Sequence, residues 1–192
     1  MATWNTGWEI EFPAETVDEV LLALAVRDLI HGASFDVESE DTGAEFAVDY
    51  TAGDEFEEGS YRLLLAVEVD GPEDAALIQA FTEQALEEAL QEAEGLLEQR
   101  TAIGEVPMSR VAFRAVPEDE ERWDLVMPDW LAPDGAEVPF GFRGFDAETG
   151  TPVPEDAALD AHGRILAVPF EGMLVIVGIP APVEHDDHVA EA

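Results

Sequence analysis

The sequence predicts an α+β fold, in which two helices pack on one face of a mostly antiparallel sheet. Several segments alternate apolar and acidic residues, which is typical of half-buried strands, and two stretches repeat apolar residues at helical spacing. Their order up to residue 116 is β-α-β-β-β-α-β. Hydrophobic residues make up 47% of the 192 residues, which is enough for a core of this kind.

The first strand and the first helix are marked by their ends. Residues 8–12 alternate apolar and acidic side chains, and Pro13 ends this strand. Thr16 and Glu19 have the spacing of a capping box, which predicts that a helix starts here. Gly32 supplies the C-terminal stop of that helix.

A hairpin and a central strand follow. Segments 35–37 and 46–50 alternate on either side of the turn at 41–43, which predicts a β-hairpin. Residues 51–60 contain acids and glycine and are expected to form a loop. Residues 61–69 form the clearest strand, and apolar side chains on both of its faces predict a central position in the sheet.

A long helix and a further strand complete the predicted α+β domain, residues 1–116. An apolar stripe runs along residues 72–100 with glutamates on the opposite side. Residues 111–115 alternate again and are expected to be the last strand of this domain.

Three further segments are expected after this domain. They are an acidic linker at 117–137, a small all-β appendage at 138–182 and an acidic tail at 183–192. Glycine and proline punctuate the appendage, in which the strand candidates are residues 141–146, 164–168 and 173–177.

The charge indicates the solvent in which the chain works. It contains no lysine, and its 8 basic residues face 45 acidic ones, for a net charge of −37. Self-repulsion of this size destabilises a compact chain. Salt screens it, because the Debye length falls from about 10 Å at 0.1 M to about 3 Å at 1 M. The composition therefore predicts a halophilic protein that folds in multimolar salt.

The same composition excludes several classes of function. Eight arginines without lysine cannot build the basic surface that binds nucleic acid or an anionic membrane. The absence of cysteine excludes disulfides and thiolate metal sites. The N-terminal residues do not resemble a signal peptide, and no apolar run approaches the roughly 18 residues of a membrane span. A soluble protein is expected.

No motif points to catalysis, and the chain is not expected to be an enzyme or to carry a cofactor. It lacks a nucleophile elbow, a phosphate-binding glycine loop and a dinucleotide fingerprint. His185 and His188 are weak candidates for metal ligands, and a solvated acidic tail is the competing interpretation. Residues 146–150 loosely resemble a calcium loop, but a tight turn accounts for them better.

Four residues are candidates for an interface. Arg110 and Arg114 are expected to share one face of a strand, where they either pair with acids of a neighbouring subunit or form internal salt bridges. Trp123 and Trp130 lie in the acidic linker, where they either cover the sheet or anchor a partner.

The element order from Thr16 to Leu90 resembles the tail terminator (tail completion) proteins of long-tailed viruses. It consists of a helix, a hairpin, an acidic loop, a strand and a Gly-Pro-Glu-Asp lead into a helix. The resemblance implies a homo-oligomeric ring that caps the tail tube and contacts other virion proteins. Segments 144–154, 160–165 and 172–178 are similar to carboxypeptidase-regulatory-like β-modules, which are structural appendages without catalytic residues.

The function hypothesis is therefore a non-enzymatic structural protein in the virion of a haloarchaeal tailed virus, at the tail end or head–tail junction. Such a protein is assembled in the cytoplasm of its host. The alternative is a cytosolic ferredoxin-like regulatory or small-ligand-binding domain of a halophilic archaeon. That domain is expected to carry a pocket between the helices and the sheet.

Overall fold

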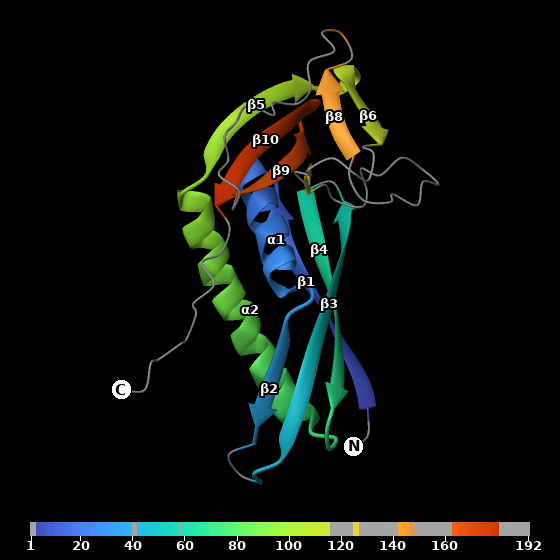
Figure 1. Ribbon diagram of the computed structural model, residues 1–192, viewed down its shortest axis with the longest axis vertical. Coiled ribbons are helices and arrows are strands. Elements are labelled where there is room, and N and C mark those ends of the chain that lie inside the picture. The colour runs from blue at the N-terminus through green and yellow to red at the C-terminus, as the bar shows by residue number, and fades with distance from the viewer. Residues whose placement is uncertain are drawn as a thin grey trace.

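The computed structural model of the chain describes residues 3–39, 42–57, 59–115, 125–126, 142–146, 148 and 163–180. These residues form two long helices and three sheets, as Figure 1 shows. The helices are α1 (Val17–Ile30) and α2 (Ala75–Glu98), with a short 3-10 helix η1 (Met108–Arg110). The strands are β1 (Thr3–Ala14), β2 (Ser34–Glu38), β3 (Glu45–Glu57), β4 (Gly59–Asp70), β5 (Thr101–Pro107), β6 (Val111–Ala115), β7 (Leu125–Val126), β8 (Phe142–Asp146), β9 (Gly163–Phe170) and β10 (Met173–Pro180).

The first sheet has the strand order β1-β4-β3-β2, and all its neighbouring strands are antiparallel. This arrangement confirms the predicted α+β class, the hairpin of β2 and β3, and the central place of β4. Side chains alternate between two faces. The face toward α1, called here the core face, carries the buried residues of β3 and β4, whereas the opposite face is called the open face.

Helix α1 begins and ends where the sequence predicts. The Glu19 backbone N–H donates to Thr16 Oγ1 at 3.3 Å, and the Thr16 N–H donates to Glu19 Oε2 at 2.9 Å. These two bonds complete the capping box. His31 caps the C-terminus, and Gly32 follows with a positive φ of 77°, which suits glycine best.

Helix α1 lies at the centre of the molecule. It contacts β1, β3 and β4 of the first sheet on one side and β9 of another sheet on a second side, and α2 packs along it. A helix surrounded in this way must be apolar nearly all round. Its buried residues include Val20, Leu21, Ala23, Leu24, Ala25, Val26 and Ile30.

The second sheet has the order β5-β10-β9-β7 and joins distant parts of the chain. Its strands are antiparallel except for β7, which runs parallel to β9. Leu166, Val168, Val177 and Ile179 belong to the same buried core as α1. The β-rich C-terminal segment that the sequence predicts is present, but it completes a sheet with β5, on the other side of the predicted linker.

Two local expectations were wrong. Residues 51–60 were expected to form a loop, whereas β3 continues to Glu57 and β4 starts at Gly59. The alternation continues through this acidic stretch, because Ala52 and Asp54 turn to the core face. Segment 111–115 is a strand as expected, but it pairs with β8 in a separate two-stranded sheet.

Candidate functional site

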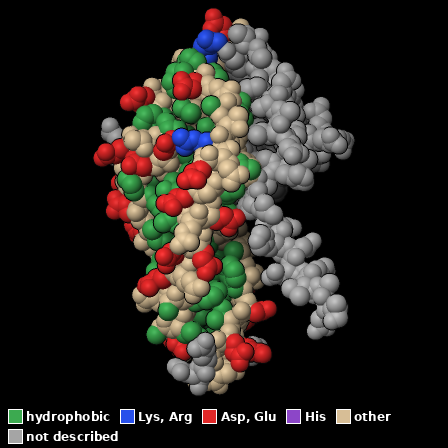
Figure 2. All heavy atoms as spheres, turned by 90° about the vertical axis from the view of Figure 1, so that its left-hand side faces the viewer, with side chains coloured by type: hydrophobic (Ala, Val, Ile, Leu, Met, Phe, Trp, Pro, Cys, Tyr) green, Lys and Arg blue, Asp and Glu red, His purple; other side chains and the backbone are tan. Residues whose placement is uncertain are grey.

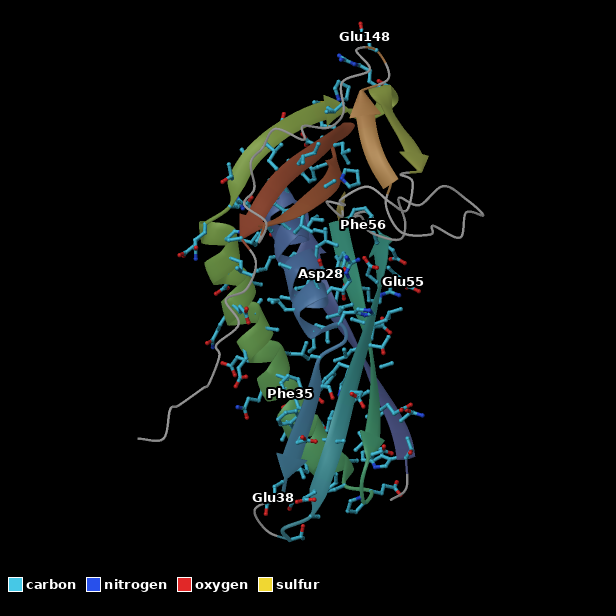
Figure 3. The ribbon with its side chains drawn as sticks, viewed as in Figure 1. Asp28, Phe35, Glu38, Glu55, Phe56 and Glu148 are labelled. Carbon is cyan, nitrogen blue, oxygen red and sulfur yellow. The ribbon has the colours of Figure 1, made fainter. Side chains whose placement is uncertain are left out.

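Only one of the predicted interface residues has a described side chain. Arg110 lies in η1, ahead of β6, and its Nε is 3.0 Å from Glu148 Oε2 (Figure 3). This ion pair within the chain favours the internal alternative for Arg110. Arg114 lies in β6 with its backbone opposite Arg143 of β8, so the two predicted arginines do not share one strand.

The other predicted site residues lie outside the described residues. They are Trp123, Trp130, His185 and His188, and their assignments stay predictions. Within the described ranges, no group of three or more His, Asp or Glu side chains is placed to hold a metal ion. No helix in these ranges is long and apolar enough to cross a membrane.

The two edges of the first sheet are the most extensive unused bonding surface in the described part of the chain. No further strand pairs with β1 or with β2 in this part. Strand β1 is 12 residues long, and β2 has 5 residues, most of them exposed. An unpaired strand presents a row of free backbone N–H and C=O groups, which is a template for another strand.

Hydrogen bonds at the end of β2 show which backbone groups face each edge. Gly32 N–H donates to the Tyr50 carbonyl and Tyr50 N–H donates to the Ala33 carbonyl, both at 2.9 Å. The backbone N–H and C=O groups of the even-numbered residues of β3 therefore point toward β2. Because successive residues in antiparallel strands turn to opposite sides, the observed registers carry this alternation across the whole sheet.

On β1 the backbone N–H and C=O groups that point away from the sheet therefore belong to the odd-numbered residues, and on β2 they belong to the even-numbered residues. These are called the outward residues. Pro13 fits this assignment, because an outward position loses no hydrogen bond when the N–H is missing. The outward residues carry their side chains on the open face of the sheet. They are Thr3, Asn5, Gly7, Glu9 and Glu11 on β1, and Ser34, Asp36 and Glu38 on β2.

Aromatic side chains border both edges on the core face. Among the large apolar side chains of the described residues, that of Phe35 on β2 is exposed, at 39%. Its ring packs edge-on against Tyr50 and Phe81. Figure 3 places it on β2 beside the lower end of α2. On β1, Trp4 and Trp8 are half-buried, and the buried Trp4 Nε1 has no hydrogen-bond partner in the structure.

Arg62 of β4 organises the acids of the open face. Its guanidinium nitrogens lie 3.0 Å from Glu9, 2.9 Å from Glu55 and 3.3 Å from Glu57. All three carboxylates are more than half exposed. Because water and salt screen such pairs, each contributes about 0–1 kcal/mol. This cluster reduces repulsion across three strands without forming a binding site.

A second polar cluster is buried between α1, β3 and β4. Arg27 Nη1 donates to Asp54 Oδ2 at 3.0 Å, and the Tyr61 hydroxyl donates to the same oxygen at 2.9 Å. Arg27 also binds the Asp28 carboxylate at 2.9 Å. Asp54 is nearly inaccessible, with a side-chain exposure of 1%. Burial opposes the charge of Arg27, but Asp28, Tyr61 and Asp54 outweigh it and raise the Arg27 pKa.

His31 accepts a hydrogen bond from the backbone of β3 at a position beyond the end of β2. The Ala52 backbone N–H donates to His31 Nδ1 at 3.1 Å. The imidazole therefore takes the place of the missing strand at this position, and the ring satisfies a backbone group as a helix-capping residue.

A surface groove of about 600 Å³ runs between α1 and α2. Its floor contains Leu22 and Leu97, and its rim carries Arg100, which pairs with Asp18 at 2.9 Å. Glu19, Glu94 and Glu98 complete the lining. The groove lies between the two helices, whereas the pocket expected for a ligand-binding domain lies between helices and sheet. Its acids suit a cationic ligand.

Comparison of the chain with known protein families, curated proteins and solved structures finds no match.

Proposed function

We propose that the chain is a non-enzymatic structural protein that assembles into a homo-oligomeric ring through the edges of its first sheet. We place this ring in the virion of a tailed virus of haloarchaea, at the tail end or head–tail junction. The observation that carries the proposal is the pair of open edges, since a 12-residue strand and a 5-residue strand lie on opposite sides of one sheet. The element order, which resembles tail terminator proteins, supports the viral setting.

Two edges on opposite sides of one sheet favour an open chain or ring of copies over a simple pair. A head-to-tail contact uses a different surface on each partner and closes into a ring when the rotation between copies allows it. The first sheet has four alternating antiparallel strands, so β1 and β2 run in opposite directions. A copy rotated about an axis along the strands thus continues the antiparallel order.

The test is the mass of the particle in solution. We expect size-exclusion chromatography with light scattering in 3–4 M KCl, the multimolar salt that screens charges within about 2 Å, to give one species of several copies. A stable monomer at high protein concentration contradicts the proposal. Binding of the oligomer to tail-tube or connector proteins of the same virus tests the location separately.

The groove between α1 and α2 supports a second candidate, a small-ligand-binding domain of a halophilic archaeon. Three glutamates and one aspartate line it, against a single arginine. If the chain is such a domain, we expect a polycation such as spermidine to raise its urea midpoint of unfolding. We expect this effect to vanish in the variant E94Q/E98Q. A monomer with such a response favours the alternative over the ring.

A further inference from the structure

The residues on the two edges of the first sheet indicate how two copies of the chain pair with each other. We propose that β2 of one copy pairs antiparallel with β1 of a second copy, with Phe35 opposite Trp8 of that copy. This interface rests on the proposed function and specifies its geometry. When the outward residues of the two strands pair with each other, the open faces of the two copies lie side by side. Both faces of the sheet therefore continue across the contact.

Charge and the Thr3–Asp70 hydrogen bond together select the register of this pairing. With Phe35 opposite Trp8, Ser34 faces Glu9, Asp36 faces Gly7 and Glu38 faces Asn5. No acid then faces another acid, and like charges directly opposite each other destabilise a strand pair. A shift of two residues in one direction sets Asp36 opposite Glu9. A shift in the other sets Glu38 opposite Thr3, whose hydroxyl already bonds Asp70.

The apolar rim supports the same register. Phe35 is 39% exposed, although its ring packs against Tyr50 and Phe81 within the chain. Opposite Trp8, it gains a cross-strand aromatic neighbour on the core face, and such pairs contribute about 0.2–1 kcal/mol. A two-fold pair of β1 strands about Gly7 also keeps acids apart, but it leaves Phe35 exposed and uses one edge only.

Disulfide cross-linking tests the register, because the chain contains no cysteine of its own. Asn5 and Glu38 are opposite in the proposed pairing, where Cα atoms lie about 5.5 Å apart, within the 4.4–6.8 Å that a disulfide spans. Within one chain the two edges are three strand spacings, about 14 Å, apart. A disulfide between these positions therefore forms between copies.

We expect oxidised N5C/E38C in multimolar KCl to give a ladder of dimers, trimers and larger covalent species on a non-reducing gel. The control T3C/E38C shifts one cysteine by about 6.7 Å along the strand and is expected to give less than a tenth of that yield. The single variants N5C and E38C are expected to stay uncross-linked.

Three outcomes overturn the proposed interface in distinguishable ways. Efficient dimers from N5C/E9C, without a ladder from N5C/E38C, identify the two-fold pairing of β1 strands. An oligomer by light scattering without either cross-link rejects this register and leaves standing a ring of copies that meet in another way. A monomer by light scattering rejects both.

A second variant tests the aromatic contact without new covalent bonds. F35S is expected to raise the dissociation constant of the oligomer by up to about fivefold in multimolar KCl, which corresponds to the loss of a contact of about 1 kcal/mol. The matched control is L64S, since Leu64 is a half-buried apolar residue on the open face of β4, away from both edges. Equal weakening by the two variants contradicts the contact, and the urea midpoint of each variant separates weaker folding from weaker assembly.

Discussion

Tyr50 and Tyr61 are the two tyrosines of the chain, and both are buried in the core. The Tyr61 hydroxyl donates to Asp54, and the Tyr50 hydroxyl lies 3.0 Å from Thr82 Oγ1. Burial raises the pKa of Tyr61 well above its usual range, where Arg27 opposes and Asp54 reinforces the shift. Burial also raises the pKa of Tyr50, against the hydrogen bond with Thr82.

These shifts predict alkaline destabilisation from a very small number of groups. Without lysine and cysteine, the tyrosines are the side chains that titrate near pH 10–12. The unfolded chain releases these protons above about pH 10 while the folded chain retains them. The free energy of unfolding therefore keeps its full value below about pH 10 and falls as the pH rises above it. The slope reaches about 1.4 kcal/mol per pH unit for each tyrosine.

Urea unfolding at fixed KCl between pH 8 and 11.5, followed by circular dichroism, measures this slope over the range in which tyrosine titrates. The variant Y61F lacks one of the two phenols, so about half of the slope is expected to remain. A free energy of unfolding that stays constant across this range contradicts the prediction.

The buried polar cluster shows why single residues resisted prediction from the sequence. The capping box and the helical repeat of apolar residues predicted α1, but nothing in that pattern marked Arg27 as a buried charge. Its partner Asp54 fell in a stretch expected to be a loop, because acids and glycine usually mark turns. Asp54 is buried only because Arg27 neutralises it, and that contact joins residues 27 positions apart. Spacing along one element does not reveal such a pair.

At the scale of elements, the Arg27–Asp54 ion pair ties α1 to the β3–β4 hairpin. Removal of Asp54 leaves Arg27 buried with Asp28 as its remaining carboxylate partner. Breaking a buried ion pair costs about 3–5 kcal/mol, and the remaining Asp28 contact places this loss at about 3 kcal/mol. We therefore expect D54A to lower the free energy of unfolding by about this amount in urea titrations at multimolar KCl.

Two further variants separate charge from packing. E55A removes an exposed partner of Arg62 on the open face and is expected to change stability by less than about 0.5 kcal/mol. R27M/D54A removes the arginine and the fully buried aspartate together and is expected to recover part of the loss, because the carboxylate left without its arginine, Asp28, is partly exposed. A loss in D54A no greater than in E55A contradicts a structural role for the pair.

Elements with strong local signals were predictable, and elements defined by distant partners were not. The capping box located the start of α1, and apolar side chains on both faces of residues 61–69 located β4 at the centre of the first sheet. Strand β5 lacks alternation around Gly104, and its partner β10 lies about 70 residues later in the chain. Its pairing is a property of the folded molecule, so the sequence pattern placed the next strand at 111–115. The free edges likewise follow from strand order, which residue periodicity does not contain.

At the scale of the whole molecule, the acids of the described residues are dispersed over helices and strands. Figure 2 shows acidic side chains scattered among apolar ones over the face that includes α2. Along the edges, Glu9, Glu11, Asp36 and Glu38 repel an approaching copy at low ionic strength. Salt therefore favours both the fold and the pairing of copies, whereas it weakens the binding of a cationic ligand.

We expect the urea midpoint of unfolding to rise steeply as KCl increases from 0.1 M to the range where the Debye length is about 3 Å or less. E87Q/E92Q removes two exposed charges of α2 and is expected to reach a given midpoint at lower KCl. Light scattering on the same samples is expected to show assembly increasing in parallel. A midpoint independent of KCl contradicts the halophilic interpretation.

The central place of α1 has a consequence for synthesis of the chain. The helix is complete after residue 30, yet β9, which contacts one of its sides, ends at residue 170. A nascent chain therefore exposes apolar surface of α1 until β9 has left the ribosome. Such late closure delays folding and invites chaperone binding. The first sheet can form early, but the molecule becomes a single cooperative unit only when its last strands arrive.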